Sequence, residues 1–250
     1  MEHPVLVFVV SLVVLWLSAR AGAYLHRRRG QDEAEHEDVG VILAASSTLL
    51  GLIIGFSFSM AVSRYDQRKN YEAEEANAIG TEYFRAGLLT AADAAKVRNL
   101  LRSYVDQRVL FYTIPDARRL EQINTSTAQL QADLWSAVQA SAATQPTFMV
   151  ALAVSGMNDL LNSQVYTQAA WWNRIPGAAW GLMAAIAICC NLLAGYNARG
   201  SKGKRKWFFL LPLIVSIAFF LIADMDSPRG GLILVHPQNL ESVSRSLHAA

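Results

Sequence analysis

The chain is 250 residues long, 53% of them hydrophobic and only 17% charged, and its formal net charge at pH 7 is +2. A charge this small gives no electrostatic basis for binding nucleic acid. The only cysteines, Cys189 and Cys190, are neighbours, which excludes a disulfide framework, and two thiols alone are too few for a metal site. The sequence also lacks a glycine-rich phosphate loop, a paired-histidine zinc motif and a nucleophile elbow, so it predicts neither an enzyme nor a bound cofactor.

The first apolar run, residues 4–25, predicts a helix that spans a membrane. A cleaved signal peptide is the alternative, because Ala21-Gly22-Ala23 resembles a cleavage site. Signal peptides begin with basic residues, whereas Met1-Glu2-His3 contains no lysine or arginine, and the basic cluster Arg27-Arg28-Arg29 follows the run instead. An uncleaved membrane anchor is therefore the better interpretation.

The second run, residues 39–63, contains no charged side chain and ends abruptly at Arg64. About 20 helical residues cross a bilayer core of about 30 Å, so this run also predicts a span, with a buried helix of a soluble protein as the alternative. Small residues form a ladder, one at every fourth position: Ser47, Gly51, Gly55, Ser59 and Ser63. Because small residues at this spacing let helix backbones approach closely in lipid, the ladder predicts a face on which another helix packs.

Residues 64–172 are more polar and predict a helical bundle outside the membrane. One helix is expected from about residue 65 to 85, and Thr90 with Asp93 resembles a capping box that begins the next. Two more helices, at about 117–142 and 148–168, follow Pro115 and Pro146. Apolar side chains at helical spacing predict core packing on the middle two helices: Val97, Leu101, Tyr104 and Phe111, then Leu120, Ile123, Leu130, Leu134 and Val138.

Two further apolar runs, residues 175–198 and 207–223, complete a prediction of four transmembrane helices. The predicted fold class is an all-α membrane protein with a long helical-bundle insert between the second and third spans. Its expected parts are residues 1–63 with two spans, 64–172 as the bundle, 173–225 with the other two spans, and 226–250 as a polar C-terminal tail.

Basic residues predict the orientation of these spans. One loop carries Arg27-Arg28-Arg29, and the loop between the third and fourth runs carries a second cluster: Arg199, Lys202, Lys204, Arg205 and Lys206. Both loops lie on one side of the membrane, and the positive-inside rule places that side in the cytoplasm. Both termini and the central bundle are then expected on the extracytoplasmic side, and the opposite orientation is the alternative.

Three motifs resemble those of a bacterial membrane family called bestrophin-like: Ser63-Arg64-Tyr65-Asp66-Gln67-Arg68, Glu75-Ala76-Asn77-Ala78-Ile79-Gly80-Thr81 and Asp226-Ser227-Pro228-Arg229-Gly230-Gly231. The resemblance covers nearly the whole chain and implies a location in the bacterial inner (plasma) membrane. The residues that carry it are Arg64, Tyr65, Asp66, Arg68, Asn77, Asp224, Asp226, Pro228, Arg229 and Gly230. The Gly55-Phe56 pair ahead of Arg64 and the four-span plan more distantly resemble bestrophin anion channels.

The distant resemblance implies a pore, with a lipid bilayer, an inorganic ion and further copies of the chain as partners. Bestrophins are pentamers whose second span lines a central neck, and in that register Thr48, Leu52 and Phe56 face the axis. These positions lie about 100° around the helix from Gly51 and Gly55, so one face can pack while the next faces the axis. A hydrophobic constriction can gate by excluding water. The alternative is that Leu52 and Phe56 face lipid or a neighbouring helix.

The sequence also departs from bestrophins. They hold the insert in the cytoplasm, whereas the basic loops here predict it outside. Eukaryotic members bind calcium through an acidic run after the fourth span, but only Asp224 and Asp226 stand here, and calcium takes about six to eight oxygen ligands. The charges after Arg64 are mixed and predict no preference for anions.

Two functions of different class therefore stay open. One is an oligomeric ion channel, anion-conducting by resemblance to bestrophins, with the second span lining the pore. The other is a non-conducting membrane protein whose helical bundle senses or binds a partner.

Overall fold

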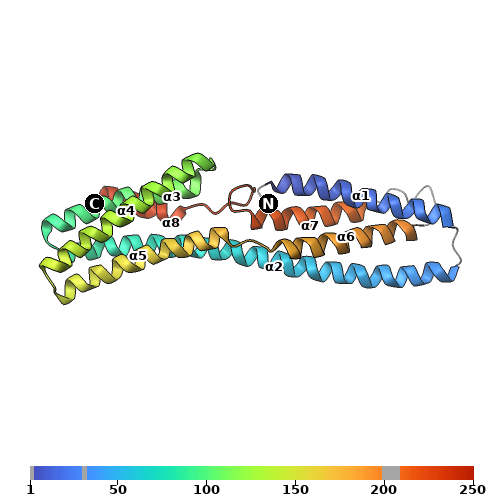
Figure 1. The fold of residues 1–250 in the computed structure, drawn as a ribbon, viewed down its shortest axis with the longest axis horizontal. Helices are drawn as coiled ribbons and strands as arrows, with labels where there is room; N and C mark the ends of the chain where they lie inside the picture. The colour runs from blue at the N-terminus through green and yellow to red at the C-terminus, as the bar shows by residue number, and fades with distance from the viewer. Residues whose placement is uncertain (1–2, 30–32, 199–208) are drawn as a thin grey trace. The chain divides into compact units, whose positions relative to one another are not determined.

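The computed structural model describes residues 3–29, 33–198 and 209–250. The elements in these ranges are helical, which confirms the predicted all-α fold for the described residues. In chain order they are α1 (Pro4–Arg29), α2 (Glu33–Arg85), the 3-10 turn η1 (Ala86–Leu88), α3 (Ala91–Thr113), α4 (Ala117–Thr144), α5 (Phe148–Trp172), α6 (Gly177–Asn197), α7 (Leu210–Asp226) and α8 (Gln238–Ala249) (Figure 1).

Within the described residues, three stretches are long and apolar enough to cross a membrane: Pro4–Arg28, Glu37–Leu88 and Phe148–Asn197, the last of which includes both α5 and α6. They contain the predicted spans 4–25 and 39–63 and all but the last residue of the predicted span 175–198. The fourth predicted span, 207–223, begins outside the described residues, and its described part belongs to α7, an apolar helix of 17 residues. The basic cluster at 199–206 also lies outside the described residues.

The chain folds as two compact units. The membrane unit comprises Met1–Tyr65 and Arg174–Leu234, and the bundle unit comprises Asp66–Asn173 and Val235–Ala250. Helix α2 belongs to both, because its 53 residues continue without a break through the predicted boundary at Ser63. At a rise of about 1.5 Å per residue, α2 is about 80 Å long.

In the membrane unit, α1 packs against α6 and α7. Its core is apolar and includes Leu15, Leu50, Trp180, Met183, Phe219 and Ile222. The closest helix approach is made by two glycines: a Cβ atom at Gly22 of α1 would collide with the carbonyl oxygen of Leu192, and one at Gly195 of α6 with that of Ala19. Glycine at both positions therefore allows backbone-to-backbone contact between α1 and α6.

The helices of the bundle unit begin and end close to the predicted positions. The Thr90 hydroxyl accepts a hydrogen bond from the Asp93 amide (3.3 Å) and lies 2.9 Å from its carboxylate, which confirms the predicted cap of α3. Helix α3 ends at Thr113, two residues before Pro115. Helices α4 and α5 begin after the capping side chains of Asp116 and Thr147. They end at Thr144 and Trp172, slightly past their expected ends.

The predicted apolar stripes of α3 and α4 form the core of this unit. All four α3 positions are at most 1% exposed, and in α4 Ile123, Leu134 and Val138 are buried, whereas Leu120 and Leu130 are half-buried. The segment expected as a polar tail contains α8, which packs against α3 and buries Leu240 and Leu247.

Candidate functional site

The face of α2 predicted to line a pore is open in the single chain. Leu52 is 55% exposed and Phe56 is 69% exposed, and Thr48 is exposed one turn earlier. The Thr48 hydroxyl donates to the carbonyl oxygen of Ala44 in its own helix (3.0 Å). One hydroxyl, whose hydrogen bond is made within the helix, and two large apolar side chains thus lie in one row. In the most apolar stretch of this helix only 6% of the residues are buried.

The glycine–serine ladder beside this row is also unoccupied. A Cβ atom at Gly51 or Gly55 would meet no heavy atom within 4 Å among the described residues. Ser59 and Ser63 are exposed as well, and Ser47 is half-buried. The glycines that do pack backbone to backbone, Gly22 and Gly195, lie on α1 and α6 and were not singled out from the sequence as a helix contact.

An ion pair joins the end of the apolar part of α2 to the end of α7. Arg64 donates to the Asp226 carboxylate at 3.3 Å, and Asp226 is 5% exposed. The same carboxylate accepts the backbone amide of Ile175, at 3.0 and 3.2 Å from its two oxygens. One carboxylate therefore fixes α2, α7 and the segment that leads into α6, all within the membrane unit.

Asp224, two residues before Asp226, binds the segment that follows α7. Its two oxygens accept the amides of Leu232 (2.7 Å) and Ile233 (2.9 Å), and the Ser227 hydroxyl accepts the amide of Gly230 (3.1 Å). A Cβ atom at Gly231 would collide with Asp224, so glycine is needed where this segment folds back. Both acidic residues in the last turn of α7 act as acceptors for amide and guanidinium donors. That they are too few to hold calcium stays a prediction from the sequence.

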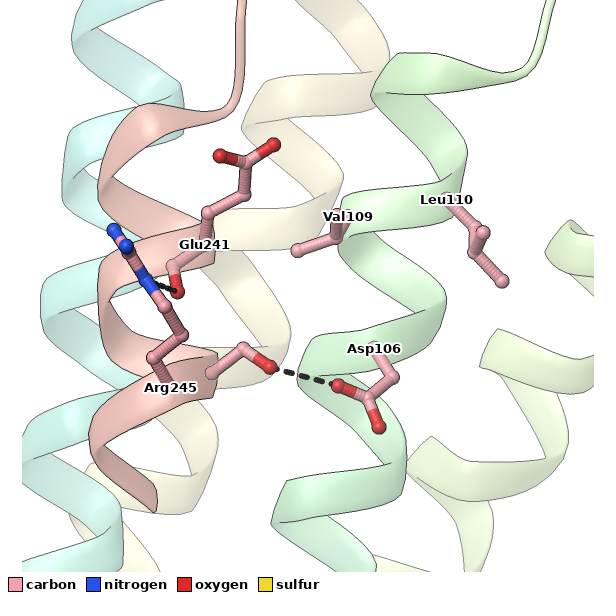
Figure 2. A pocket seen from close by; sticks show the side chains of 6 residues that line it. Asp106, Val109, Leu110, Glu241 and Arg245 are labelled. Atoms are coloured by element: carbon pink, nitrogen blue, oxygen red, sulfur yellow. Dashed lines mark hydrogen bonds between the residues drawn. The ribbon is translucent and has the colours of Figure 1, made fainter. Parts of the chain in front are cut away.

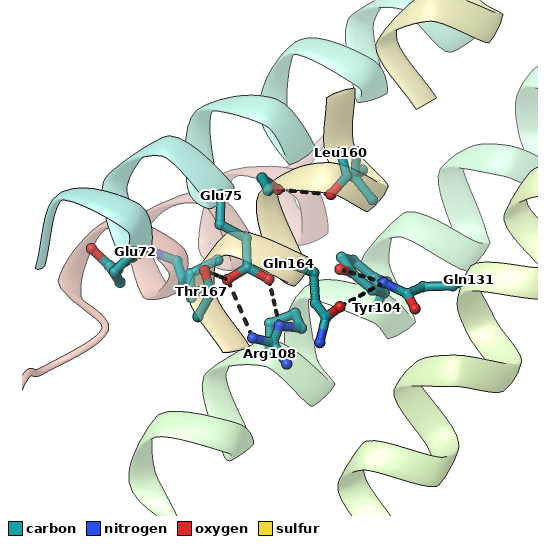
Figure 3. Close-up of polar contacts among 10 residues, drawn as sticks. Glu72, Glu75, Tyr104, Arg108, Gln131, Leu160, Gln164 and Thr167 are labelled. Carbon is teal, nitrogen blue, oxygen red and sulfur yellow. Dashed lines mark hydrogen bonds and ion pairs between the residues drawn. The ribbon is translucent and has the colours of Figure 1, made fainter. Parts of the chain in front are cut away.

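The bundle unit contains a buried ion pair that the sequence did not indicate. Figure 3 shows Glu75 of α2 between Arg108 of α3 and Thr167 of α5. Arg108 donates to both carboxylate oxygens, through Nε to Oε1 and through Nη2 to Oε2 at 3.3 Å, and the Thr167 hydroxyl donates to Oε2 at 3.1 Å. Glu75 and Arg108 are both 0% exposed, so two opposite charges and their hydrogen bonds link three helices in the core.

The surroundings favour the charged form of Arg108 and the neutral form of the nearby phenols. Burial by itself would lower the pKa of Arg108, but the adjacent Glu75 carboxylate opposes this and the net pKa is raised. Burial, followed by the charge of Glu75, raises the pKa of Tyr104 and of Tyr112. The guanidinium also lies over the ring of Phe111, 4.4 Å from its centre.

A second carboxylate of α2 holds the C-terminal helix. Glu72, 1% exposed, accepts the amides of Asn239 and Leu240 at 2.9 Å each and the Asn239 side-chain amide at 2.6 Å. These donors belong to the first turn of α8, where free amides and the helix dipole favour a negative charge. Glu72 therefore caps α8 from another helix.

The described residues contain open pockets, and one of about 440 Å³ is lined by residues of α4, of α5 and of the loop between them. Another open pocket of about 440 Å³ lies between α3 and α8, and Figure 2 shows Asp106 and Arg245 at its lining. The Ser244 hydroxyl donates to Asp106 there (2.8 Å). The remaining lining residues of this pocket are Val109, Leu110 and Glu241. In the described part of the chain, no group of three or more histidine, cysteine or acidic side chains is arranged to hold a metal ion. The open face of α2 is thus the candidate functional surface.

A family described as "Bestrophin-like domain" matches residues 5–240. The chain belongs to the bestrophin-like family. No curated protein matches it.

Solved structures of bacterial bestrophins resemble this bestrophin-like chain in fold. A bacterial bestrophin homologue from Klebsiella pneumoniae, crystallised as a single-residue variant, is 15% identical, with a TM-score of 0.65 over 97% of this chain and 98% of that one. A second structure of the homologue, solved by Zn-SAD phasing, is 13% identical, with a TM-score of 0.62 over 98% and 97%. At such identities the likeness establishes the shared fold over the full length of both chains, and nothing finer.

The bestrophin-like motif residues occupy different surroundings. Arg64 and Asp226 form an ion pair, and Pro228, two residues after Asp226, is buried. Tyr65 and Arg229 are half-buried, and Gly230 is exposed but donates its amide to Ser227. In the bundle unit, Arg68 is 1% exposed, whereas Asp66 and Asn77 are exposed. The motif residues that are brought together therefore tie the ends of helices in place.

Proposed function

We propose that the chain is one subunit of an oligomeric, bestrophin-like ion channel in the bacterial inner membrane, with α2 lining the pore. The subunit has four spans: α1, the apolar part of α2, α6 and the helix that includes α7. Thr48, Leu52 and Phe56 face the axis of a ring of subunits, a pentamer by resemblance to bestrophins. The Gly51/Gly55 ladder packs against the neighbouring copy.

One observation carries this proposal: the face of α2 that carries Leu52, Phe56 and the glycines of the ladder is not covered by the described chain. Leu52 and Phe56 are more than half exposed, and nothing described approaches Gly51 or Gly55. The ladder would be filled within one subunit if it served only to fold that subunit. An uncovered ladder beside a row of large side chains supports a helix that has neighbouring copies on one face and the pore on the next.

The anchoring contacts suit such a role. A pore-lining helix must keep its rotation about its own axis, because a turn of about 100° would exchange the pore face for the ladder. The Arg64–Asp226 pair, with the Ile175 amide on the same carboxylate, fixes this rotation two turns after Phe56. Membership of a family related to bestrophins favours conduction over catalysis.

The proposal is tested by chloride and potassium flux in liposomes with purified protein carrying Phe56→Ala or Leu52→Ala. Removing an apolar side chain that faces the axis widens and wets the constriction, so both variants should conduct more than the wild type. Phe58→Ala is the matched control, because it removes the same ring about 200° around the same helix from Phe56.

Thermal stability in detergent is measured on the same variants. Flux above wild type for Phe56→Ala and Leu52→Ala, at unchanged stability and with Phe58→Ala at the wild-type level, supports a pore along α2. Flux at the empty-liposome baseline for the wild type and every variant would overturn the channel and favour the non-conducting alternative.

A further inference from the structure

The bundle unit contains a third buried glutamate on α2 whose surroundings differ from those of Glu72 and Glu75. Glu82 is 0% exposed, and neither of its carboxylate oxygens has a hydrogen-bond partner among the described residues. Burying an ionised carboxylate without a donor is strongly unfavourable, so such a group normally exists as the neutral acid. Glu72 and Glu75 each accept three or more hydrogen bonds and have no such constraint.

The carboxyl group of Glu82 occupies a space beside a glycine on the facing helix, called here its seat. A Cβ atom at Gly156 of α5 would collide with Oε2 of Glu82 and also with the Arg85 side chain. Glycine in the middle of a helix costs roughly 1 kcal/mol relative to alanine. Its presence here leaves the space that the carboxyl group of Glu82 occupies between α2 and α5.

Two charged groups face this seat, one from each helix. Arg85 lies one turn after Glu82 on α2, and Asp159 lies one turn after Gly156 on α5, with Arg85 Nη1 3.9 Å from the Asp159 carboxylate. Burial raises the pKa of Glu82 to about 8; the charge of Arg85 works against this rise and the charge of Asp159 adds to it. Arg85 therefore pairs with Asp159, whose side chain is 65% exposed, and its charge also acts on the buried Glu82.

We infer that Glu82 and Gly156 form a proton-operated contact between α2 and α5. As the neutral acid, Glu82 fits the space at Gly156 and the two helices close over it. When Glu82 releases its proton to water, the carboxylate needs donors that the seat does not provide, so it draws Arg85 from Asp159 and the contact loosens. The proton is the only species exchanged.

The direction of the pH dependence follows from the two protonation states. The ordinary pKa of a glutamate, 4.5, applies to the unfolded chain, and the folded value is about 8. Between these values the folded chain holds a proton that the unfolded chain has lost, so the stability of the bundle falls as the pH rises through this window. Above the folded pKa both states are ionised, and the dependence on this group ends.

Protonation is measured directly by infrared difference spectroscopy of the full-length protein in detergent, following the carbonyl stretch of a protonated carboxylic acid between pH 5 and pH 10. The matched pair is Glu82→Gln and Glu74→Gln, which make the same chemical change at a buried and an exposed position of α2. A protonated band that titrates near pH 8 should be present in the wild type and Glu74→Gln and absent in Glu82→Gln. A band that persists in Glu82→Gln, or that is absent from the wild type at pH 6, would overturn the inference.

Two charge variants should shift the midpoint of the infrared titration in opposite directions. They keep the test independent of whether Glu82→Gln folds. Asp159→Asn removes a negative charge and should lower the midpoint, and Arg85→Gln removes a positive charge and should raise it. Hydrogen exchange of the α5 peptide around Gly156, corrected for the intrinsic pH dependence of exchange, should increase above the midpoint in each protein that titrates and stay constant in Glu82→Gln. Midpoints that do not move in these directions would contradict the proposed surroundings of Glu82.

These measurements concern the bundle unit and do not depend on conduction. Where the proposed function also holds, the continuous helix α2 carries both Glu82 and the pore face, and flux should differ between pH 6 and pH 9 in the wild type but not in Glu82→Gln. Flux that is absent at every pH, with the infrared titration intact, would refute the channel and leave the proton-operated contact standing. Flux whose pH dependence survives in Glu82→Gln would remove Glu82 from its control.

Discussion

The two parts of α2 reverse the usual relation between polarity and burial. In the membrane unit one face of the helix carries large apolar side chains that are open: Leu52 and Phe56 are more than half exposed. In the bundle unit its side chains are charged and closed: Glu72, Glu75 and Glu82 are at most 1% exposed. A helix of a soluble protein shows the opposite pattern, with its apolar stripe covered and its charges in water.

The difference shows where the partners of each part are found. Two of the buried glutamates of the bundle, Glu72 and Glu75, find donors within the chain, from Arg108 and Thr167 to the first turn of α8, whereas Glu82 has none among the described residues. The face of the apolar part that carries Gly51, Leu52 and Phe56 is not covered by the described residues, whereas Leu50 and Ala61 of the same helix are buried in the core of the membrane unit. The open part of α2 is therefore expected to meet lipid, further copies of the chain and the pore.

The largest expected effect is on the closed part. Glu75→Gln leaves the Arg108 guanidinium charged, buried and without its counter-ion, and should lower the free energy of unfolding of the bundle by about 3–5 kcal/mol. Denaturant or thermal unfolding in detergent measures this loss. Glu74→Gln, at an exposed position one residue earlier, should stay within about 0.5 kcal/mol of the wild type. Equal stability of the two variants would show that the buried pair contributes nothing to the bundle.

A smaller effect is expected on the open part. Gly55→Leu places a bulky side chain where a neighbouring backbone is proposed to pack, and an overpacked contact costs about 1–3 kcal/mol. The oligomer of this variant should therefore dissociate after less dilution of the protein in detergent than the wild type. The control Ile53→Leu, a near-isosteric change two residues away, should assemble normally. Native mass measurement of the solubilised protein compares the two. Identical assembly would show that the ladder is not an interface.

Much of the fold follows from local sequence signals. The apolar runs, Thr90, Pro115 and Pro146 mark where helices begin and end, and the α3 stripe from Val97 to Phe111 gives its buried side. These features depend on hydrophobic periodicity and on residues that restrict the backbone, both of which act over a few positions. The motif residues Arg64 and Asp226 were also indicated by the sequence, although only as family positions.

The long-range polar contacts could not be read in the same way. Glu75 and Arg108 are 33 residues apart, and Glu72 and Leu240 are 168 apart, so no local pattern joins them. In the sequence Glu72, Glu74 and Glu75 read as charges on a solvated helix, and nothing distinguishes the exposed one from the two that are buried. Helix α8 was missed because its two buried leucines are seven positions apart in an otherwise polar segment. The orientation predicted from the basic loops stays a prediction.

The central claim, that Leu52 and Phe56 line a conduction path, is tested most directly by cysteine substitution followed by thiol modification. Leu52→Cys, Phe56→Cys and the control Phe58→Cys are made in a background carrying Cys189→Ala and Cys190→Ala, and flux is recorded before and after a water-soluble thiol reagent. A polar adduct formed in the pore obstructs it, so modification should reduce flux at positions 52 and 56 and leave it unchanged at position 58. Flux that is equally insensitive at all three positions, in liposomes that conduct, would contradict a pore along this face of α2.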